Sequence, residues 1–148
     1  MDRLRVYIAT NYDMRDWVEM MIRQPLEVRG CEIVSTWHAG PAAVESALTE
    51  EEADRIRAIN LRDLARAEVC VVFSTDRGGE HHAEAALAHR EGLRLIWHGR
   101  HILLAKVPGV IRCAEVTDVF DAVGDLARIK RGRVPTYPPP AMTGTDER

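Results

Sequence analysis

The chain has 148 residues, of which 46% are hydrophobic and 5% aromatic, and its formal net charge is −3. This length fits one domain with an ordinary core, and the composition predicts an aliphatic interior rather than a disordered or fibrous chain. The negative balance argues against nucleic acid as a partner. No apolar run approaches the ~20 residues that span a bilayer, so we expect no membrane partner.

The cysteines Cys31, Cys70 and Cys113 are widely spaced and form no CxxC pair. An odd, scattered set argues against a disulfide framework and against structural zinc. We therefore expect buried, reduced thiols. The first residues also lack the long apolar stretch and cleavage site of a signal peptide, so the sequence predicts a cytoplasmic protein.

Predicted strands and helices alternate along the chain. Pro25 is expected to kink or restart the first helix, and Thr49 with Glu52 has the spacing of a capping box that opens the second. A turn is expected at 40–43. The predicted strands are 4–10, 31–37, 68–73, 93–97 and a short 110–114, and the predicted helices are 14–28, 49–67, about 80–90 and about 117–130.

This alternation predicts an α/β fold, in which βαβ units build a mostly parallel sheet of about five strands. The predicted architecture is a three-layer α/β/α domain of the Rossmann or flavodoxin-like kind over residues 1–131. Residues 132–148, which contain PTYPPP and no periodicity, are expected to form a flexible tail. Ligands of such sheets bind beyond the carboxyl ends of the strands.

The segment from Ser74 to Glu84 follows the third predicted strand and is the strongest site candidate. Gly78 and Gly79 either form a flexible turn or let backbone N–H groups approach an anion at a helix start. Glu84 falls near the first turn of an alanine-rich helix, where it is either an ordinary solvated glutamate or a nucleophile. His82 and Glu84 match the HxE of zinc deaminases, but no PCxxC follows, so neither a metal nor a cofactor is predicted.

Several motifs, taken in order, resemble the nucleoside 2-deoxyribosyltransferase family, which includes 2′-deoxynucleoside 5′-monophosphate N-glycosidases. The resemblance runs from about Arg5 to Val123. Its most specific part is GGxHxxE followed by an alanine-rich helix. The matching segments are VYIAT, GCEIVSTW, NLRDLARA, EVCVVFS, GGEHHAEAALAHREG, LRLIWHG and PGV.

The resemblance implies that Glu84 attacks the anomeric carbon of a deoxyribose and displaces the base, which leaves a covalent glycosyl-enzyme. It also implies that Tyr7 orients the glutamate and that Asp63 contacts the sugar or assists departure of the base. Considered without the family, Tyr7 is better explained as a half-buried strand aromatic and Asp63 as a surface charge on a helix. The segment Ala83–Ala86 departs from the Gly-x-Glu-x-Gly-Tyr pattern of many transferases.

Further candidates flank the strand ends, and each keeps an alternative. Trp37 either stacks on the base or belongs to the edge of the core, and Asp76 is either a rival carboxylate or a turn residue. Asn11 and Arg15 are either phosphate contacts or a turn and a solvated helix face. The predicted substrate contacts are Thr10, Asn11, Arg15, Trp37, Asp76, Gly78, Gly79 and His81.

The expected function is cleavage or transfer of the N-glycosidic bond of a 2′-deoxynucleoside or its 5′-monophosphate, with transferase and hydrolase both open. The alternative is a non-catalytic domain that binds or senses a nucleotide. A small-molecule nucleoside or nucleotide is therefore the expected partner, and the resemblance implies a homo-oligomer, a dimer or larger.

Overall fold

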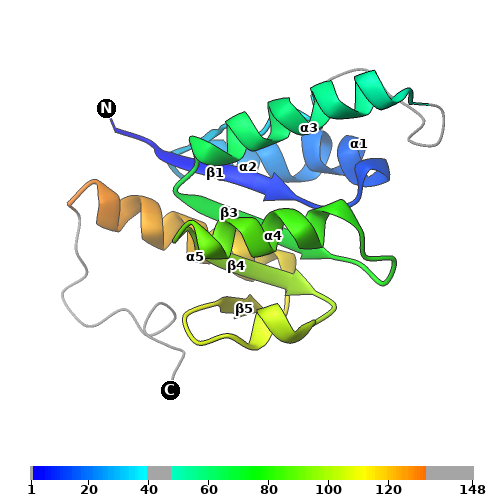
Figure 1. Cartoon of the computed structure of the whole chain (residues 1–148). Helices are drawn as coiled ribbons and strands as arrows, with labels where there is room; N and C mark the ends of the chain where they lie inside the picture. The colour runs from blue at the N-terminus through cyan, green and yellow to red at the C-terminus, as the bar shows by residue number, and fades with distance from the viewer. Residues whose placement is uncertain (1, 40–47, 133–148) are drawn as a thin grey trace.

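The computed structural model describes residues 2–39 and 48–132, so the turn expected at 40–43 and nearly all of the expected tail lie outside the described residues. Five strands form one sheet in the order β2-β1-β3-β4-β5 (Figure 1). Every neighbouring pair is parallel, which confirms the predicted α/β class. The strands are β1 (Leu4–Ala9), β2 (Cys31–Ile33), β3 (Val69–Ser74), β4 (Arg94–Gly99) and β5 (Ile111–Cys113).

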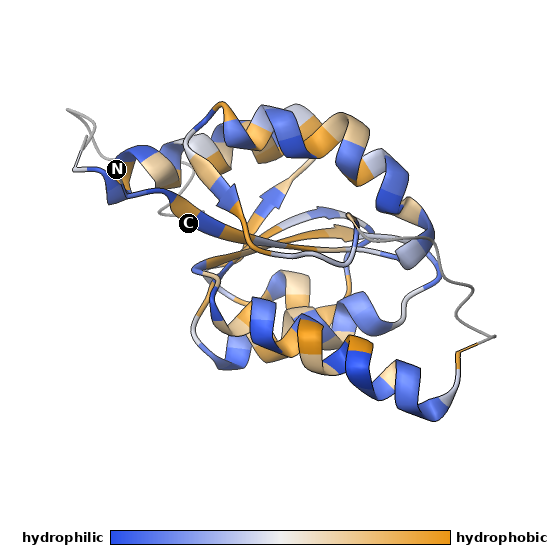
Figure 2. Cartoon of the chain, turned by 90° about the horizontal axis from the view of Figure 1, so that it is seen from above, coloured by the Kyte–Doolittle hydropathy of each residue, from blue (hydrophilic) through white to orange (hydrophobic). Residues whose placement is uncertain are grey.

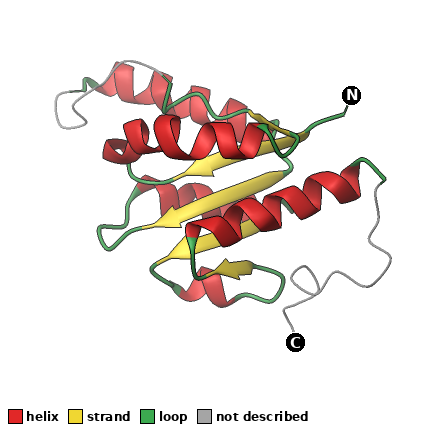
Figure 3. Cartoon of the chain, turned by 180° about the vertical axis from the view of Figure 1, so that it is seen from behind, coloured by secondary structure: helices red, strands yellow, loops and turns green. Residues whose placement is uncertain are grey.

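Helices cover both faces of the sheet, as the edge-on view shows (Figure 2). On one face lie η1 (Tyr12–Met14), α1 (Arg15–Trp17), η2 (Val18–Ile22), α2 (Arg23–Glu27) and α5 (Val116–Lys130), which are nearest the viewer in Figure 3. The other face carries α3 (Glu50–Ala65) and α4 (Glu80–Arg90), and η4 (Leu103–Lys106) connects β4 to β5. No helix in the described part of the chain is long and apolar enough to cross a membrane.

Two buried clusters form the core, one on each side of the sheet. Because successive strand residues point to opposite faces, Val6 and Ile8 of β1 join the cluster under α2 and α5. Tyr7 and Ala9 join the cluster under α3 and α4. This alternation directs Tyr7 toward the helix that carries Glu84. The three cysteines are buried and free, as their spacing predicts.

The first helix changes its hydrogen-bond register before Pro25. Residues 18–22 form a π-helical turn in which the Arg23 N–H donates to the Val18 carbonyl, and the α-helix restarts at Arg23. Proline has no backbone N–H to donate to the helix, and its ring crowds a carbonyl of the preceding turn. A change of hydrogen-bond register next to Pro25 is therefore expected. The predicted restart is therefore present, two residues earlier than Pro25.

Strand β2 ends at Ile33, whereas the sequence predicts strand to residue 37. The pairing reaches Val6 opposite Ile33, and the next backbone groups of β1 bond to side chains instead. The Ile8 N–H donates to Ser35 Oγ at 3.1 Å, and Trp37 Nε1 donates to the Ile8 carbonyl at 2.7 Å. These two bonds replace the ladder, which lets the chain leave the sheet and turn Trp37 back over β1.

Candidate active site

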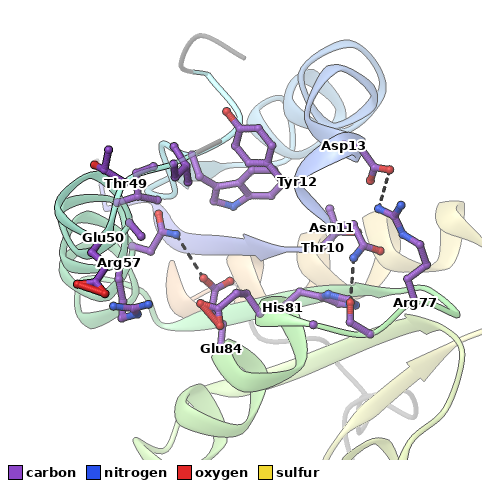
Figure 4. Close-up of a pocket in the computed structure, with 18 residues that line it drawn as sticks. Thr10, Asn11, Tyr12, Asp13, Thr49, Glu50, Arg57, Arg77, His81 and Glu84 are labelled. Atoms are coloured by element: carbon purple, nitrogen blue, oxygen red, sulfur yellow. Dashed lines mark hydrogen bonds and ion pairs between the residues drawn. The ribbon is translucent and has the colours of Figure 1, made fainter. Parts of the chain in front are cut away.

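A cavity of about 570 Å³ lies beyond the carboxyl ends of β1 and β3 (Figure 4). The sheet order places β2 on one side of β1 and β3 on the other, so this is where the connections reverse direction and where parallel sheets open a crevice. Its walls come from the loop after β1, from α3, and from the loop and first turns of α4. The lining residues are Thr10, Asn11, Tyr12, Asp13, Trp37, Leu48, Thr49, Glu50, Ala53, Ile56, Arg57, Asn60, Arg77, Gly78, Gly79, Glu80, His81 and Glu84.

Glu84 projects from α4 into this cavity (Figure 4). The helix packs closely on the sheet because Ala85 and Ala88, which face it, are small and fully buried. Burial is the main reason that the pKa of Glu84 rises to about 7, and the charge of Glu80 adds to it. Nearby Tyr7 and Asn60 act in the opposite direction. The carboxylate is thus partly desolvated and lies next to two polar side chains.

Buried polar atoms without partners gather around Glu84. Among the described residues, the buried side-chain nitrogens and oxygens without a hydrogen-bond partner are Tyr7 Oη, Asn60 Oδ1 and both ring nitrogens of His81. Asn60 Nδ2 lies 3.5 Å from Glu84 Oε2, a long hydrogen bond. Tyr7 lies close enough to lower the pKa of Glu84, although its hydroxyl makes no bond of standard geometry. Such atoms are rare in native proteins, so three neighbouring residues that carry them mark a place for a ligand.

Burial also sets the protonation of these neighbours. The pKa of Tyr7 is raised far above its ordinary value, first by burial and then by the charge of Glu84, so the hydroxyl keeps its proton. The pKa of His81 falls to about 4, first by burial and then by the neighbouring His82. At neutral pH the site therefore contains a neutral phenol and a neutral imidazole beside Glu84.

The Asp63 side chain lies under the site and does not line the cavity. It is fully buried, and its Oδ2 accepts hydrogen bonds from the Thr36 N–H at 3.1 Å and the Thr36 hydroxyl at 2.6 Å. Its Oδ1 lies 2.9 Å from Arg62 Nη2. Asp63 thus fixes the backbone immediately before Trp37 to α3.

A second buried network fixes the other side of Trp37. His38 Nδ1 lies 2.5 Å from Glu19 Oε2, and His38 Nε2 lies 2.8 Å from Ser35 Oγ. Burial lowers the pKa of His38, and a carboxylate only accepts hydrogen bonds, so Nδ1 carries the proton and Nε2 accepts from Ser35. Glu19 belongs to the π-helical turn, a feature frequent at functional sites.

Trp37 and Tyr12 form an aromatic wall of the cavity. Their ring centroids are 6.2 Å apart at an interplanar angle of 40°. In Figure 4 Tyr12 lies across the cavity from Glu84. Both rings and Glu84 line the same cavity of about 570 Å³, and aromatic faces stack on small flat molecules.

The loops after β1 and β3 are tied to each other. Thr10 Oγ1 donates to the Phe73 carbonyl at 2.7 Å, and Asn11 Nδ2 donates to the Gly78 carbonyl at 3.0 Å. Thr75 Oγ1 also donates to Asn11 Oδ1. Gly78 and Gly79 have φ of 66° and 119°, which explains why glycines stand there.

The structure brings together seven of the predicted site residues as cavity lining, namely Thr10, Asn11, Trp37, Gly78, Gly79, His81 and Glu84. Neither Arg15 nor Asp76 lines the cavity. The Arg15 guanidinium lies over the Tyr12 ring, 5.9 Å from its centroid, and the Asp76 carbonyl accepts a bond from Arg100 Nη1 at 2.9 Å. Tyr7 and Asp63 lie behind the lining.

His82, the histidine next to His81, has a separate environment. Its Nε2 lies 2.9 Å from Ser74 Oγ, and its ring stacks on Trp97 at 5.9 Å and 18°. His82 therefore packs against the sheet, while His81 faces the cavity. The ring centroids of His82 and His81 are 4.1 Å apart, so the His82 ring supports the His81 ring.

Eleven of the lining residues are absent from the sequence-based prediction, among them Asn60, which lies beside Glu84, and Tyr12 of the aromatic wall. Asn60 had a signal, because it stands four residues from both Ile56 and Leu64 and so interrupts the inward-facing apolar stripe of α3 with an amide. Tyr12 had none beyond its position in the loop after the first strand.

The fold and the site define a flavodoxin-like α/β domain whose small-molecule cavity lies at the switch point of the sheet. No family model and no curated protein matches the chain. Among solved structures, the chain is similar to a 2-deoxyribosyltransferase from the psychrotolerant bacterium Bacillus psychrosaccharolyticus, with a TM-score of 0.63 and 15% sequence identity. The match covers 79% of this chain and 90% of that one, so the two share their fold, as the sequence motifs predict.

Proposed function

We propose that the chain is an enzyme that breaks the N-glycosidic bond of a 2′-deoxynucleoside or its 5′-monophosphate, with Glu84 as the nucleophile. One observation carries the proposal: the partly desolvated Glu84 lies in the cavity among the buried polar atoms that have no partner in the described structure. The structural neighbour is a 2-deoxyribosyltransferase used to synthesise nucleosides, which supports the same class of bond.

The chemistry follows from a carboxylate next to a sugar. An ionised Glu84 oxygen attacks the anomeric carbon, the bond from that carbon to the base nitrogen breaks, and its electron pair leaves with the base. The product is a glycosyl ester of Glu84. In the second step a new base or a water attacks the same carbon and frees the carboxylate. Transfer and hydrolysis differ only in this acceptor.

Neighbouring side chains have separate roles in this proposal. The Tyr7 hydroxyl, which keeps its proton, donates toward a Glu84 oxygen and directs the other one at the sugar. The Asn60 amide lies on the same carboxylate from the opposite element, α3. Asp63 acts as a positioning residue, because it fixes Thr36 and through it the Trp37 wall on which the base stacks.

The proposal is tested by incubating the protein with a deoxynucleoside and a second free base, and separating the products by chromatography. A new nucleoside supports transfer, and free deoxyribose supports hydrolysis. The Glu84→Gln variant is expected to lose both activities, and intact-mass spectrometry of the wild type is expected to show a glycosyl adduct. Full activity in Glu84→Gln would overturn the proposal.

Binding without turnover is a second candidate, and one observation favours it. With a pKa of about 7, Glu84 is about half protonated at neutral pH, and a protonated carboxyl is a poor nucleophile. This reading predicts calorimetric binding of a nucleoside or nucleotide with no base release at any pH. Base release at alkaline pH would exclude it.

A further inference from the structure

The lining of the cavity is acidic. Its charged side chains include four carboxylates, on Asp13, Glu50, Glu80 and Glu84, and only two arginines among the described residues. A ligand that brings further negative charge therefore meets repulsion, while an uncharged ligand does not.

Both arginines are already paired with carboxylates. Arg77 Nη2 lies 2.6 Å from Asp13 Oδ2, and the arginine is 66% exposed. Arg57 Nη1 lies 2.8 Å from Asp54 Oδ1, and this arginine is 55% exposed. The carboxylate beside each arginine offsets its positive charge, so the two cations offer a phosphate little net attraction.

Two polar side chains of these loops are also occupied. The Asn11 amide donates to the Gly78 carbonyl, and the Thr10 hydroxyl donates to the Phe73 carbonyl. The α4 start, which otherwise attracts anions, carries Glu80 in its first turn. His81 is neutral at neutral pH and adds no positive charge.

We infer that this site selects uncharged 2′-deoxynucleosides over their 5′-monophosphates, and that Glu80 and Asp13 determine this selectivity. The inference rests on the proposed function and names its substrate class. A 5′-monophosphate carries about −1.5 to −2 charges at pH 7, and both carboxylates oppose it. Asp13 acts twice, since it also neutralises Arg77.

The test compares kcat/KM of the full-length wild type for a deoxynucleoside and for the corresponding 5′-monophosphate. We expect about a ten-fold or larger preference for the nucleoside, which corresponds to ~1.4 kcal/mol. Glu80→Gln and Asp13→Asn should each shift the ratio toward the monophosphate by about three-fold, in line with exposed charges. The matched control is Glu91→Gln, which removes an exposed carboxylate at the far end of α4, outside the cavity, and should leave the ratio unchanged.

Calorimetry with Glu84→Gln separates this inference from the proposed function. Tighter binding of the nucleoside than of the monophosphate supports the selectivity even if the wild type releases no base, in which case only the proposed function fails. Base release that is fastest from the monophosphate, or a ratio that Glu80→Gln and Asp13→Asn leave unmoved, overturns the selectivity while the chemistry at Glu84 stands. Equal or absent binding of both ligands also overturns it.

Discussion

Replacing Glu84 by glutamine should stabilise the protein, by an amount that depends on pH. The pKa of Glu84 is about 7 in the fold against an ordinary 4.5, so between these values the folded protein binds a proton that the unfolded chain has released. Stability therefore falls as pH rises through this window. At ~1.4 kcal/mol per ten-fold change in proton affinity, the cost above pH 7 is at most about 3.5 kcal/mol. Glutamine has no charge to bury and avoids it.

Urea unfolding of wild type and Glu84→Gln at several pH values measures this difference. We expect nearly equal free energies of unfolding at about pH 4, and an advantage for the variant of about 1–3 kcal/mol at about pH 8. Glu91→Gln, which removes an exposed carboxylate at the C-terminal cap of α4, should show no such rise. A pH-independent difference, or a variant less stable than wild type at pH 8, would refute the argument that the buried, ionised Glu84 carboxylate destabilises the folded protein.

Three further predictions concern rate, positioning and backbone. Base release should increase with pH through about 7, because ionised Glu84 is the attacking form, and a kcat/KM profile that declines over this range would contradict that role. His38→Leu should raise KM about ten-fold with a smaller change in kcat, measured by steady-state kinetics, because Trp37 loses its support; an unchanged KM would show that the wall stands without it. Gly99→Ala should cost about 2 kcal/mol or more in urea unfolding, since φ is +100° and a Cβ would lie 2.1 Å from the Ser74 carbonyl oxygen.

The fold was predictable because each strand and helix carries a local signal. The run Val69–Ser74 is buried along its whole length, as a central parallel strand must be. Its nearly continuous apolar sequence predicts this burial. The capping box of Thr49 and Glu52 is present as its spacing predicts. The end of β2 was not predictable, because it depends on Ser35 and Trp37 bonding to Ile8 across the fold rather than on strand propensity.

The site was predictable in part. Strand order and family motifs direct attention to Glu84 and the glycines before it, all of which line the cavity. Asp63 differs, since its sequence position says nothing of the bonds to Thr36 that bury it. Asn60 was missed because an argument from hydrophobic periodicity considers only the apolar positions of a helix. The polar residue that interrupts the apolar stripe of α3 is the one whose amide lines the cavity.

The unpartnered atoms around Glu84 explain why this place is the active site candidate rather than a weak point of the core. A buried polar atom without a partner costs about 1–3 kcal/mol, and an apolar residue of similar shape would avoid the cost. In the described structure these atoms belong to Tyr7, Asn60 and His81, which come from three different elements and meet beside one carboxylate. Packing alone gives no reason for polar groups from β1, α3 and α4 to converge there. The proposed nucleoside substrate would give such a reason, because its hydroxyl groups and base carry donors and acceptors that can pair with polar atoms the fold leaves open.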